Sequence, residues 1–568
     1  MDPADLPHGV PKPEMLYGLQ EWVVEIIDRI FSVLENVPSL KKGFHMGQIL
    51  SATIGRFFDV FLQQMSPKLH AAALNRIVRK VTQSIIPAAQ KYIGSIVDSA
   101  VFSCPPDGLK ALIPALCDKV IPNGSLNTSE SEAVYYTHML GHAVRRAGPH
   151  SAPYAERIEA VIGVVAMHTE KEYYKQGQKL LRKYLKGILN VLPTDNRSLP
   201  PSMWGCDKIT DFYAACGTVV SPDKSEVTWR VPAEGCLSRA RSIVDKFAGP
   251  ALASVSGDAA PAEMRVALSC VSNIVRGASA IFSPKDAPSL GSWDGTVDEG
   301  DDAPDADHED GEDGCAGSHL LRLVSSDGDG GWADATRSKM EKALIAFSKK
   351  HANAENPDVT TLKQAVRLVE CFLSCNGSSP GLSGKKKASC NYNKNVYRDW
   401  SKGPERHFRD YSVVRSYALL LRREDRGMME ETQGTGELVD ALISLCTHEY
   451  SLVRKKAQKS LPKVLKRYPR MGHKVVVTAL KVISDPASTK GALNGAIFTI
   501  QNAWGLRKVW IPLHSMSIFS VRLLLVAFGT FGPLSAGQPT LLSTIPRVLA
   551  PPACGYLRGN PAHALYLF

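Results

Sequence analysis

Cysteine is scarce in this sequence, with 12 residues in 568, and the cysteines lack the spacing of a disulfide framework. A reducing cytosolic or nuclear compartment is therefore the expected setting. The first 14 residues have no basic start followed by an apolar run, so we expect no signal peptide. Strand-like alternation of apolar and polar residues is missing over any length, which leaves an all-α class.

Charge of one sign is missing from two stretches. Residues 286–321 contain no Lys or Arg and 12 Asp or Glu, so the net charge of +11 divides into −12 here and +23 elsewhere. We expect 286–331 to be a disordered acidic insert, because such a composition cannot bury a core. Residues 503–568 contain five Lys or Arg and no Asp or Glu. This acid-free tail includes an apolar run, Met516 to Leu534, that we discount as a membrane span, and we predict that the tail is not natively folded.

Apolar residues recur at three- and four-residue steps through the remaining regions, 1–285 and 332–502, as in Ile158, Val161, Ile162 and Val165. Such spacing predicts helices that bury one face each. Helix after helix without a long heptad favours stacked helix pairs. The sequence therefore predicts an α-solenoid, interrupted by the acidic insert.

The clearest predicted pair covers 436–468. Its second helix begins near Leu452 and carries the order V-R-x-x-A-x-x-x-L of a HEAT repeat, in which Ala permits a close crossing and Arg reaches a carboxylate or carbonyl of a neighbour. Pro462 is expected to kink this helix or break its hydrogen-bond ladder. The motif residues are Val453, Arg454, Ala457 and Leu461.

No combination of residues predicts catalysis or a metal site. Gly377 to Gly381 matches G-x-S-x-G by letters only, because that motif needs a strand before it and a helix after it. His138 and His142 are four residues apart but lack a third ligand, and Cys371, Cys375 and Cys390 are too loosely spaced for zinc. We expect a protein that is not an enzyme and holds no metal.

Lys385, Lys386 and Lys387 lie in a Gly- and Ser-rich stretch, and they suit either an anion-binding or nuclear import patch or an ordinary solvated loop. The basic excess outside the insert favours anionic partners, but it does not choose among nucleic acid, inositol phosphates and acidic protein surfaces. Because no nucleic-acid-binding motif accompanies the charge, we expect no direct DNA binding.

Three blocks occur in the order seen in the large single-chain HEAT-repeat proteasome activators, which the chain resembles over about 135–502. The most specific block is Cys446 to Leu461, followed by Gly491-Ala492-Leu493. The other two blocks are Tyr174 to Leu181, and Trp204-Gly205 with Trp229 to Glu234.

The resemblance implies an α-solenoid dome on the end ring of the 20S proteasome that promotes degradation without ATP or ubiquitin. It implies a non-catalytic regulator in the nucleus and cytoplasm, linked to DNA repair and to turnover of acetylated histones. Inositol phosphates are the ligands that it allows. From the sequence as a whole we expect a monomer with no membrane association.

The chain departs from this family in two places. Family members are much longer and end in a hydrophobic-Tyr-any motif that docks on the ring, whereas this chain ends Leu565-Tyr566-Leu567-Phe568. The acetyl-lysine-reading region has no counterpart. The alternative is therefore a generic HEAT-repeat scaffold that binds acidic partners. The sequence does not settle whether this chain activates the proteasome, which residues would contact it, or what the acidic insert does.

Overall fold

The structure is a computed structural model, and it describes a set of segments separated by gaps. All statements below concern these segments, which are residues 13–36, 54–55, 57–63, 65–127, 129–189, 192–193, 229–230, 232–257, 259–282, 330–352, 358–374, 432–465, 468 and 471–502. The predicted acidic insert up to residue 329, the Lys385–Lys387 patch and the tail from 503 lie outside them.

Helices dominate the described segments and form two rows. The first row consists of α3 (Pro67–Gln83), α5 (Pro105–Val120), α7 (Ala155–Val165), α10 (Glu234–Ser256), α12 (Gly330–Ala352), α16 (Gln433–Cys446) and α18 (Gly472–Ser484). The second row consists of α4 (Gln90–Ser103), α6 (Glu130–Arg145), α8 (Lys171–Ile188), α11 (Pro261–Gly277), α13 (Val359–Ser374), α17 (Ser451–Leu465) and α19 (Lys490–Asn502).

The remaining elements are minor or terminal. Helix α1 (Pro13–Glu35) packs on α3, and three short 3₁₀ helices accompany the N-terminal pairs: η2 (Pro87–Ala89), η3 (Pro122–Gly124) and η4 (Gly148–Tyr154). Two strands of two residues each, β1 (Leu192–Pro193) and β2 (Trp229–Arg230), pair antiparallel. The second of these strands lies in the Trp229 to Glu234 block, where the sequence gives no strand signal.

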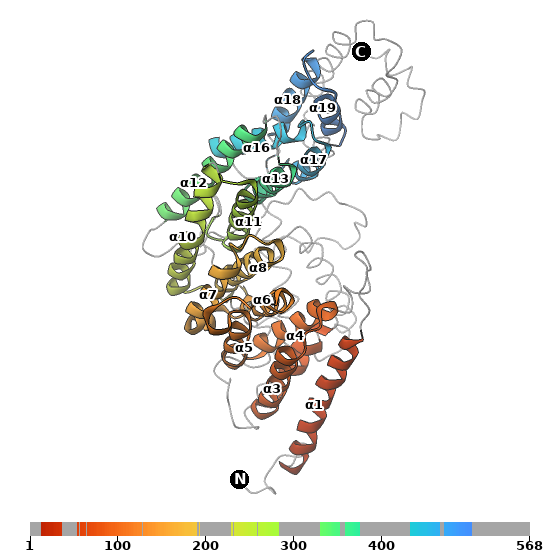
Figure 1. Ribbon diagram of the computed structural model, residues 1–568, viewed down its shortest axis with the longest axis vertical. Helices are drawn as coiled ribbons and strands as arrows, with labels where there is room; N and C mark the ends of the chain where they lie inside the picture. Colours follow the sequence, from red (N-terminus) through yellow and green to blue (C-terminus); the bar gives the residue numbers. More distant parts are fainter. Residues whose placement is uncertain are drawn as a thin grey trace, which may run out of the picture.

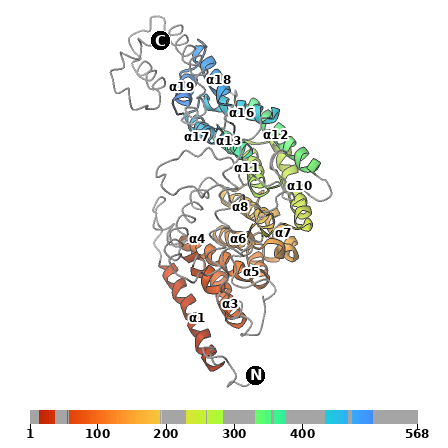
Figure 2. The same cartoon turned by 180° about the vertical axis from the view of Figure 1, so that it is seen from behind.

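Consecutive helices form pairs, and the pairs stack into a curved array (Figure 1). Each second-row helix contacts the next one along the row, from α4 through α6, α8, α11, α13 and α17 to α19. The first-row helices lie on the outer side of the curve and the second-row helices on its inner side, as the reverse view also shows (Figure 2). The predicted all-α solenoid is confirmed.

The predicted apolar stripes form the interior of this stack. Ile158, Val161, Ile162 and Val165 of α7 are all fully buried, as are Leu438 and Leu442 of α16. Buried residues from α1 to α18 belong to one continuous apolar core rather than to separate domain cores. Because each helix pair can cover its apolar face only against its neighbours, the core runs along the whole array.

Glycines set how closely the second-row helices approach. A Cβ atom on Gly187 of α8 would lie 2.2 Å from the carbonyl oxygen of Val144 in α6. A Cβ atom on Gly277 of α11 would lie 2.8 Å from Cβ of Leu185 in α8. No side chain fits at such distances, so glycine is what permits α6, α8 and α11 to pack this tightly.

Two details differ from the sequence predictions. Pro462 lies inside α17, and the helix continues past it to Leu465. The proline falls in the last turn, where the loss of one backbone hydrogen bond affects few residues that follow. Helix α12 begins at Gly330, so it includes the last two residues of the predicted insert.

Candidate functional site

The HEAT-type residues of the pair α16–α17 lie where a repeat needs them. Val453, Ala457 and Leu461 are buried between the helices. Arg454 does not reach a neighbouring carboxylate. Its guanidinium donates to the carbonyl oxygens of His448, at 2.7 Å, and Glu449, which lie in the turn between α16 and α17. Arg454 therefore binds the carbonyl groups of its own turn.

Glycines of α19 pack against this turn. A Cβ atom on Gly495 would lie 2.7 Å from the carbonyl oxygen of Cys446 and 2.8 Å from Cδ of Arg454. A Cβ atom on Gly491 would lie 3.0 Å from the carbonyl oxygen of Glu449. The two stretches quoted for the resemblance, Cys446 to Leu461 and Gly491 to Leu493, are therefore parts of one packed junction.

A glutamine fixes the same junction at two places in the array. Gln178 of α8 donates to the carbonyl oxygens of Ala166, at the end of α7, and Val266, in α11, at 3.0 and 2.9 Å. Gln458 of α17 donates to the carbonyl oxygens of Cys446, at the end of α16, and Gly495, in α19, both at 3.1 Å. Each glutamine thus ties its own pair to the next second-row helix.

This equivalence extends along the sequence at an offset of 280 residues. His168 and His448 each accept a hydrogen bond at Nδ1 from the backbone N–H two residues later, at 3.1 Å in both cases. Within α8 and α17 the same offset gives five further identical pairs besides the glutamines, which are Lys175 and Lys455, Lys179 and Lys459, Leu181 and Leu461, Lys183 and Lys463, and Leu185 and Leu465. Helices α8 and α17 are copies of one repeat type.

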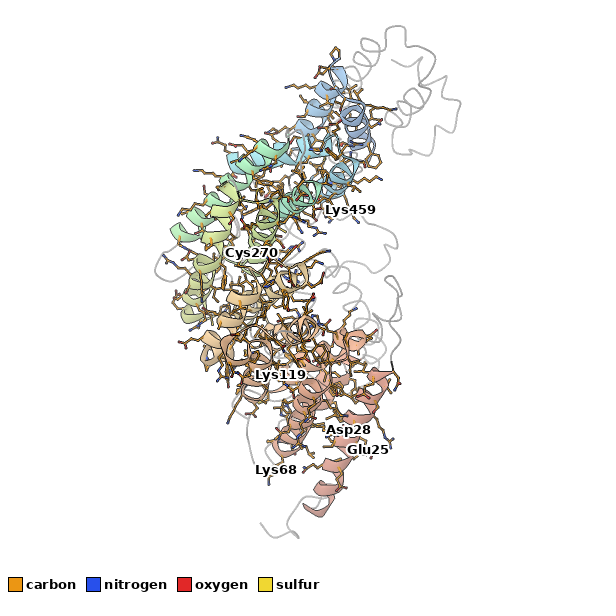
Figure 3. All side chains as sticks on the ribbon, viewed as in Figure 1. Glu25, Asp28, Lys68, Lys119, Cys270 and Lys459 are labelled. Atoms are coloured by element: carbon orange, nitrogen blue, oxygen red, sulfur yellow. The ribbon has the colours of Figure 1, made fainter. Side chains whose placement is uncertain are left out.

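Positive charge is concentrated on the inner row. The four central inner helices, α8, α11, α13 and α17, carry 15 Lys or Arg and three Asp or Glu. Their four outer partners, α7, α10, α12 and α16, carry nine Lys or Arg and eight Asp or Glu. The excess is therefore +12 on these four inner helices against +1 on their four outer partners. Lys459 is labelled at the inner edge of the array in Figure 3, and Cys270 of α11 lies within it.

We call the following inner-row residues the basic track: Lys179, Arg182 and Lys183 of α8, Arg276 of α11, Arg367 of α13 and Lys456 of α17. Burial lowers the pKa of Arg182, and the neighbouring charge of Arg276 lowers it further. Burial also lowers the pKa of Lys179, with a further contribution from Arg182. The cations of α8 and α11 thus repel one another across the close helix crossing.

The track continues to both sides of this crossing. Burial holds the pKa of Lys183 well below its ordinary value, and Arg145 of α6 adds to the effect. The Arg276 Nε lies 3.1 Å from Sγ of Cys371 in α13, one turn from Arg367. Burial lowers the pKa of Lys456, and the carboxylate of Glu370 opposes this shift while Arg367 adds to it. Like charges therefore lie near one another from α8 to α17.

Most of the track has no acidic partner within the described segments. Of its six residues only Lys456 forms an ion pair there, 3.5 Å from Glu370, which also binds Lys463 and Ser460 at 2.6 and 2.7 Å. Asp98, whose negative charge acts on Lys183, forms ion pairs with Arg145 and Arg146 at 3.1 Å each. Crowded cations without counter-charges are typical of a surface that binds an anion.

The histidine and cysteine candidates from the sequence form no group of metal ligands in the described segments. His138 and His142 face each other on α6 with ring centroids 4.8 Å apart, and burial together with Lys183 lowers the pKa of His138 to about 3. Cys371 is buried against Arg276 and Ser272. Within the described segments there is no group of three or more potential metal ligands, and no helix combines the length and apolarity of a membrane span.

Sequence reasoning missed the basic track because it looked for charge in a continuous run. The track instead consists of single residues on successive helices. A signal was present, since Lys175, Lys179 and Lys183 recur at i, i+4 spacing and again 280 residues later. The predicted patch at Lys385 to Lys387 lies outside the described segments.

Comparisons with known proteins find a HEAT-repeat family model and one curated relative. Residues 16–282 match the family model for the mid HEAT repeats region of proteasome activator complex subunit 4. Proteasome activator subunit 4 of Arabidopsis thaliana is 20% identical over an alignment that covers 89% of this chain and 30% of that protein. The chain thus spans less than a third of the length of this relative.

Solved structures give a weaker likeness. Kap121p bound to Ste12p is 12% identical, with a TM-score of 0.23 over 94% of this chain and 50% of the other. Kap121p bound to Pho4p is 11% identical, with a TM-score of 0.23 over 92% of this chain and 50% of the other. At these TM-scores the likeness carries no argument. The match over 16–282 and the Arabidopsis relative instead support a HEAT-repeat protein similar to part of proteasome activator subunit 4.

Proposed function

We propose that the chain is the HEAT-repeat part of a proteasome activator, which binds the end ring of the 20S core and promotes degradation without ATP or ubiquitin. The match of residues 16–282 to the mid HEAT repeats of subunit 4 carries this proposal. A curved stack suits the role, because it offers a broad surface of many shallow contacts. The chain acts as a non-catalytic regulator that shifts the gate of the ring toward its open state.

The finer expectations of the family belong to the same proposal. They place the protein in the nucleus and cytoplasm, as a monomer, in DNA repair and in turnover of acetylated histones. They also allow inositol phosphates as ligands, for which cations without an acidic partner among the described residues, such as Lys183 and Arg276, supply the chemistry.

The test is co-sedimentation of the chain with purified 20S core particles in a density gradient. A parallel sample contains a version of the chain extended beyond Gln501. If the proposal holds, at least the extended version moves with the 20S peak. If neither version moves with it under low-salt conditions, binding to the ring is refuted.

A second function, a scaffold for acidic partners, is favoured by the +12 excess on the four central inner helices. Such a scaffold would capture a non-proteasomal partner from the same cells, and moderate salt would release it. Capture of 20S subunits without such a partner favours the first function instead.

A further inference from the structure

We infer that the inner row of the array binds extended, Asp- and Glu-rich polypeptide segments along the basic track. This inference does not require the proteasome role. It rests on where the cations lie, on the lack of an acidic partner for five of the six among the described residues, and on the repeat that places them.

The track crosses four helices, each of which packs on the next: α8 contacts α11, α11 contacts α13, and α13 contacts α17. Neighbouring packed helices are about 10 Å apart, so three crossings span roughly 30 Å. An extended chain rises about 3.3 Å per residue, and about nine or ten residues cover that span. A carboxylate on every second or third residue would then meet a cation on each helix in turn.

The helices at the two ends of the track, α8 and α17, present lysines at matching positions, and on α17 this lysine is Lys459, which lies beside the track residue Lys456. Lys179 and Lys459 follow the bridging glutamines Gln178 and Gln458 at the same offset, and both are exposed. Because the glutamines make equivalent hydrogen bonds, these lysines occupy equivalent places on α8 and α17. The same charge is thus offered at each end of a surface that a single extended segment can reach.

The close crossing of α8 and α11 explains why the centre of the track needs an anion. Gly277 lets the backbones approach, and a Cβ atom there would lie 3.0 Å from the carbonyl oxygen of Arg182. Arg182 and Arg276 are consequently brought together with no acidic partner in the described segments. A bound carboxylate removes this repulsion, and an arginine pair suits its two oxygens.

Nucleic acid fits this surface less well than an acidic polypeptide. Proteins that bind single strands stack bases on exposed aromatic side chains. Among the described residues, no large hydrophobic or aromatic side chain is exposed on α8, α11 or α13. Carboxylates need no such platform, and the mixed lysines and arginines of the track can each pair with one.

The experiment measures binding of a fluorescent 12-residue oligoglutamate peptide to the full chain by anisotropy. We expect saturable binding that weakens steeply as salt rises, and at least about tenfold weaker binding of a four-residue peptide, which cannot span the track. An oligolysine peptide of equal length should not bind. Binding that does not depend on peptide length would overturn the inference.

A matched pair of variants locates the surface. The inner variant carries Lys179→Gln, Lys183→Gln and Arg367→Gln, and the outer variant carries Lys110→Gln, Lys339→Gln and Lys342→Gln on exposed positions of α5 and α12. Both lose three positive charges. The inner variant should bind the 12-residue peptide roughly tenfold more weakly than wild type, whereas the outer variant should stay within about twofold. Equal losses in both variants would reduce the effect to net charge and refute the track.

Circular dichroism melting shows whether the inner variant is folded. Its melting temperature should equal or exceed that of wild type, because the substitutions remove repulsion between unpaired cations. A single-stranded 12-mer oligonucleotide and inositol hexakisphosphate serve as rival ligands. If either one binds more tightly than oligoglutamate and loses that binding in the inner variant alone, the track is a phosphate site and the inference is wrong.

Discussion

At the scale of single residues, the array depends on a few polar side chains that tie backbone groups of neighbouring pairs together. Gln178 is fully buried and donates both of its amide hydrogens to carbonyl oxygens of α7 and α11. Gln458 makes the equivalent bonds but is less buried. A buried carbonyl that loses its donor bears a full desolvation cost, so Gln178 should contribute more to stability than Gln458.

Replacing Gln178 by Ala should therefore lower stability by about 1–3 kcal/mol, since it leaves a cavity and removes two donors. Gln458→Ala should cost less, because water can reach part of that site. Thermal melting of both variants checks the order. A larger shift for Gln458→Ala than for Gln178→Ala would contradict the repeat interpretation.

Glycine substitutions test the close helix approach. Gly187→Ala would place a methyl group 2.2 Å from the carbonyl oxygen of Val144, so α6 and α8 must separate, at a cost of about 1–3 kcal/mol. A Cβ atom on Gly163 of α7 would have no neighbouring atom within 4 Å. Gly163→Ala should therefore raise the free energy of unfolding by up to about 1 kcal/mol, because Ala has the higher helix propensity. Opposite shifts of the melting temperature are expected, and a stabilised Gly187→Ala variant would exclude the close crossing.

The sequence reveals the residue roles unevenly. Burial of Val453, Ala457 and Leu461 follows from helical spacing alone, and it is observed. The partner of Arg454 could not be predicted, because the choice between its own turn and the next pair depends on distances that only packing sets. The packing role of a glycine such as Gly187 could not be predicted, because it depends on how close the backbone of the neighbouring helix lies.

At the scale of helices, the second row carries both the stacking contacts and the charge. One buried ion network links α13 to α17, where Glu370 accepts hydrogen bonds from Lys463 and Ser460 and pairs with Lys456. Burial alone would raise the pKa of Glu370, but Lys463 and Ser460 hold this pKa below its ordinary value. The ionised carboxylate is therefore stabilised in the folded array.

The sign of the pH dependence follows from this lowered pKa. The folded state favours ionised Glu370 more than the unfolded state does, so its contribution to stability is present above the unfolded pKa and is lost as pH falls through the folded pKa. Glu370→Gln should cost about 1–3 kcal/mol near neutral pH, less than a fully buried pair because both lysines stay partly exposed. In acid the difference from wild type should shrink.

Melting curves recorded between pH 7 and pH 3 measure this effect. Glu437→Gln is the control, since Glu437 is an exposed partner of Lys349 at 3.7 Å and should contribute little at any pH. A Glu370→Gln deficit that stays constant down to pH 3 would show that the carboxylate charge is not what stabilises α13 on α17.

Helix existence was predictable, because apolar stripes mark α7, α8, α13 and α16 directly. Helix placement was less so. Pro462 suggested a break, yet α17 continues to Leu465, since the packing of Val464 and Leu465 holds the last turn. The short strand pair of β1 and β2 has no periodic signal, because two residues are too few to show alternation.

At the scale of the whole molecule, the net charge of +11 is the sum of regions that differ in charge. The inner row, the outer row and the acidic stretch 286–321 each carry their own balance. Composition alone could predict an anionic partner, but it could not place the binding surface, because the track forms only when four helices stack. Figures 1 and 2 show the helices that carry the track, α8, α11, α13 and α17, on the inner side of the curve.

Deleting residues 290–321 should leave the melting temperature nearly unchanged, since this stretch offers little apolar surface to bury. Differential scanning calorimetry of the shortened chain tests this prediction. A drop of several degrees would show that the acidic stretch packs on the array.

The proteasome role is tested most directly by the rate at which purified 20S cores hydrolyse a fluorogenic peptide as the chain is titrated in. The account predicts a saturable increase without ATP or ubiquitin, for the chain or for its version extended beyond Gln501. A rate that stays at that of 20S alone, while circular dichroism shows both versions folded and helical, would contradict it.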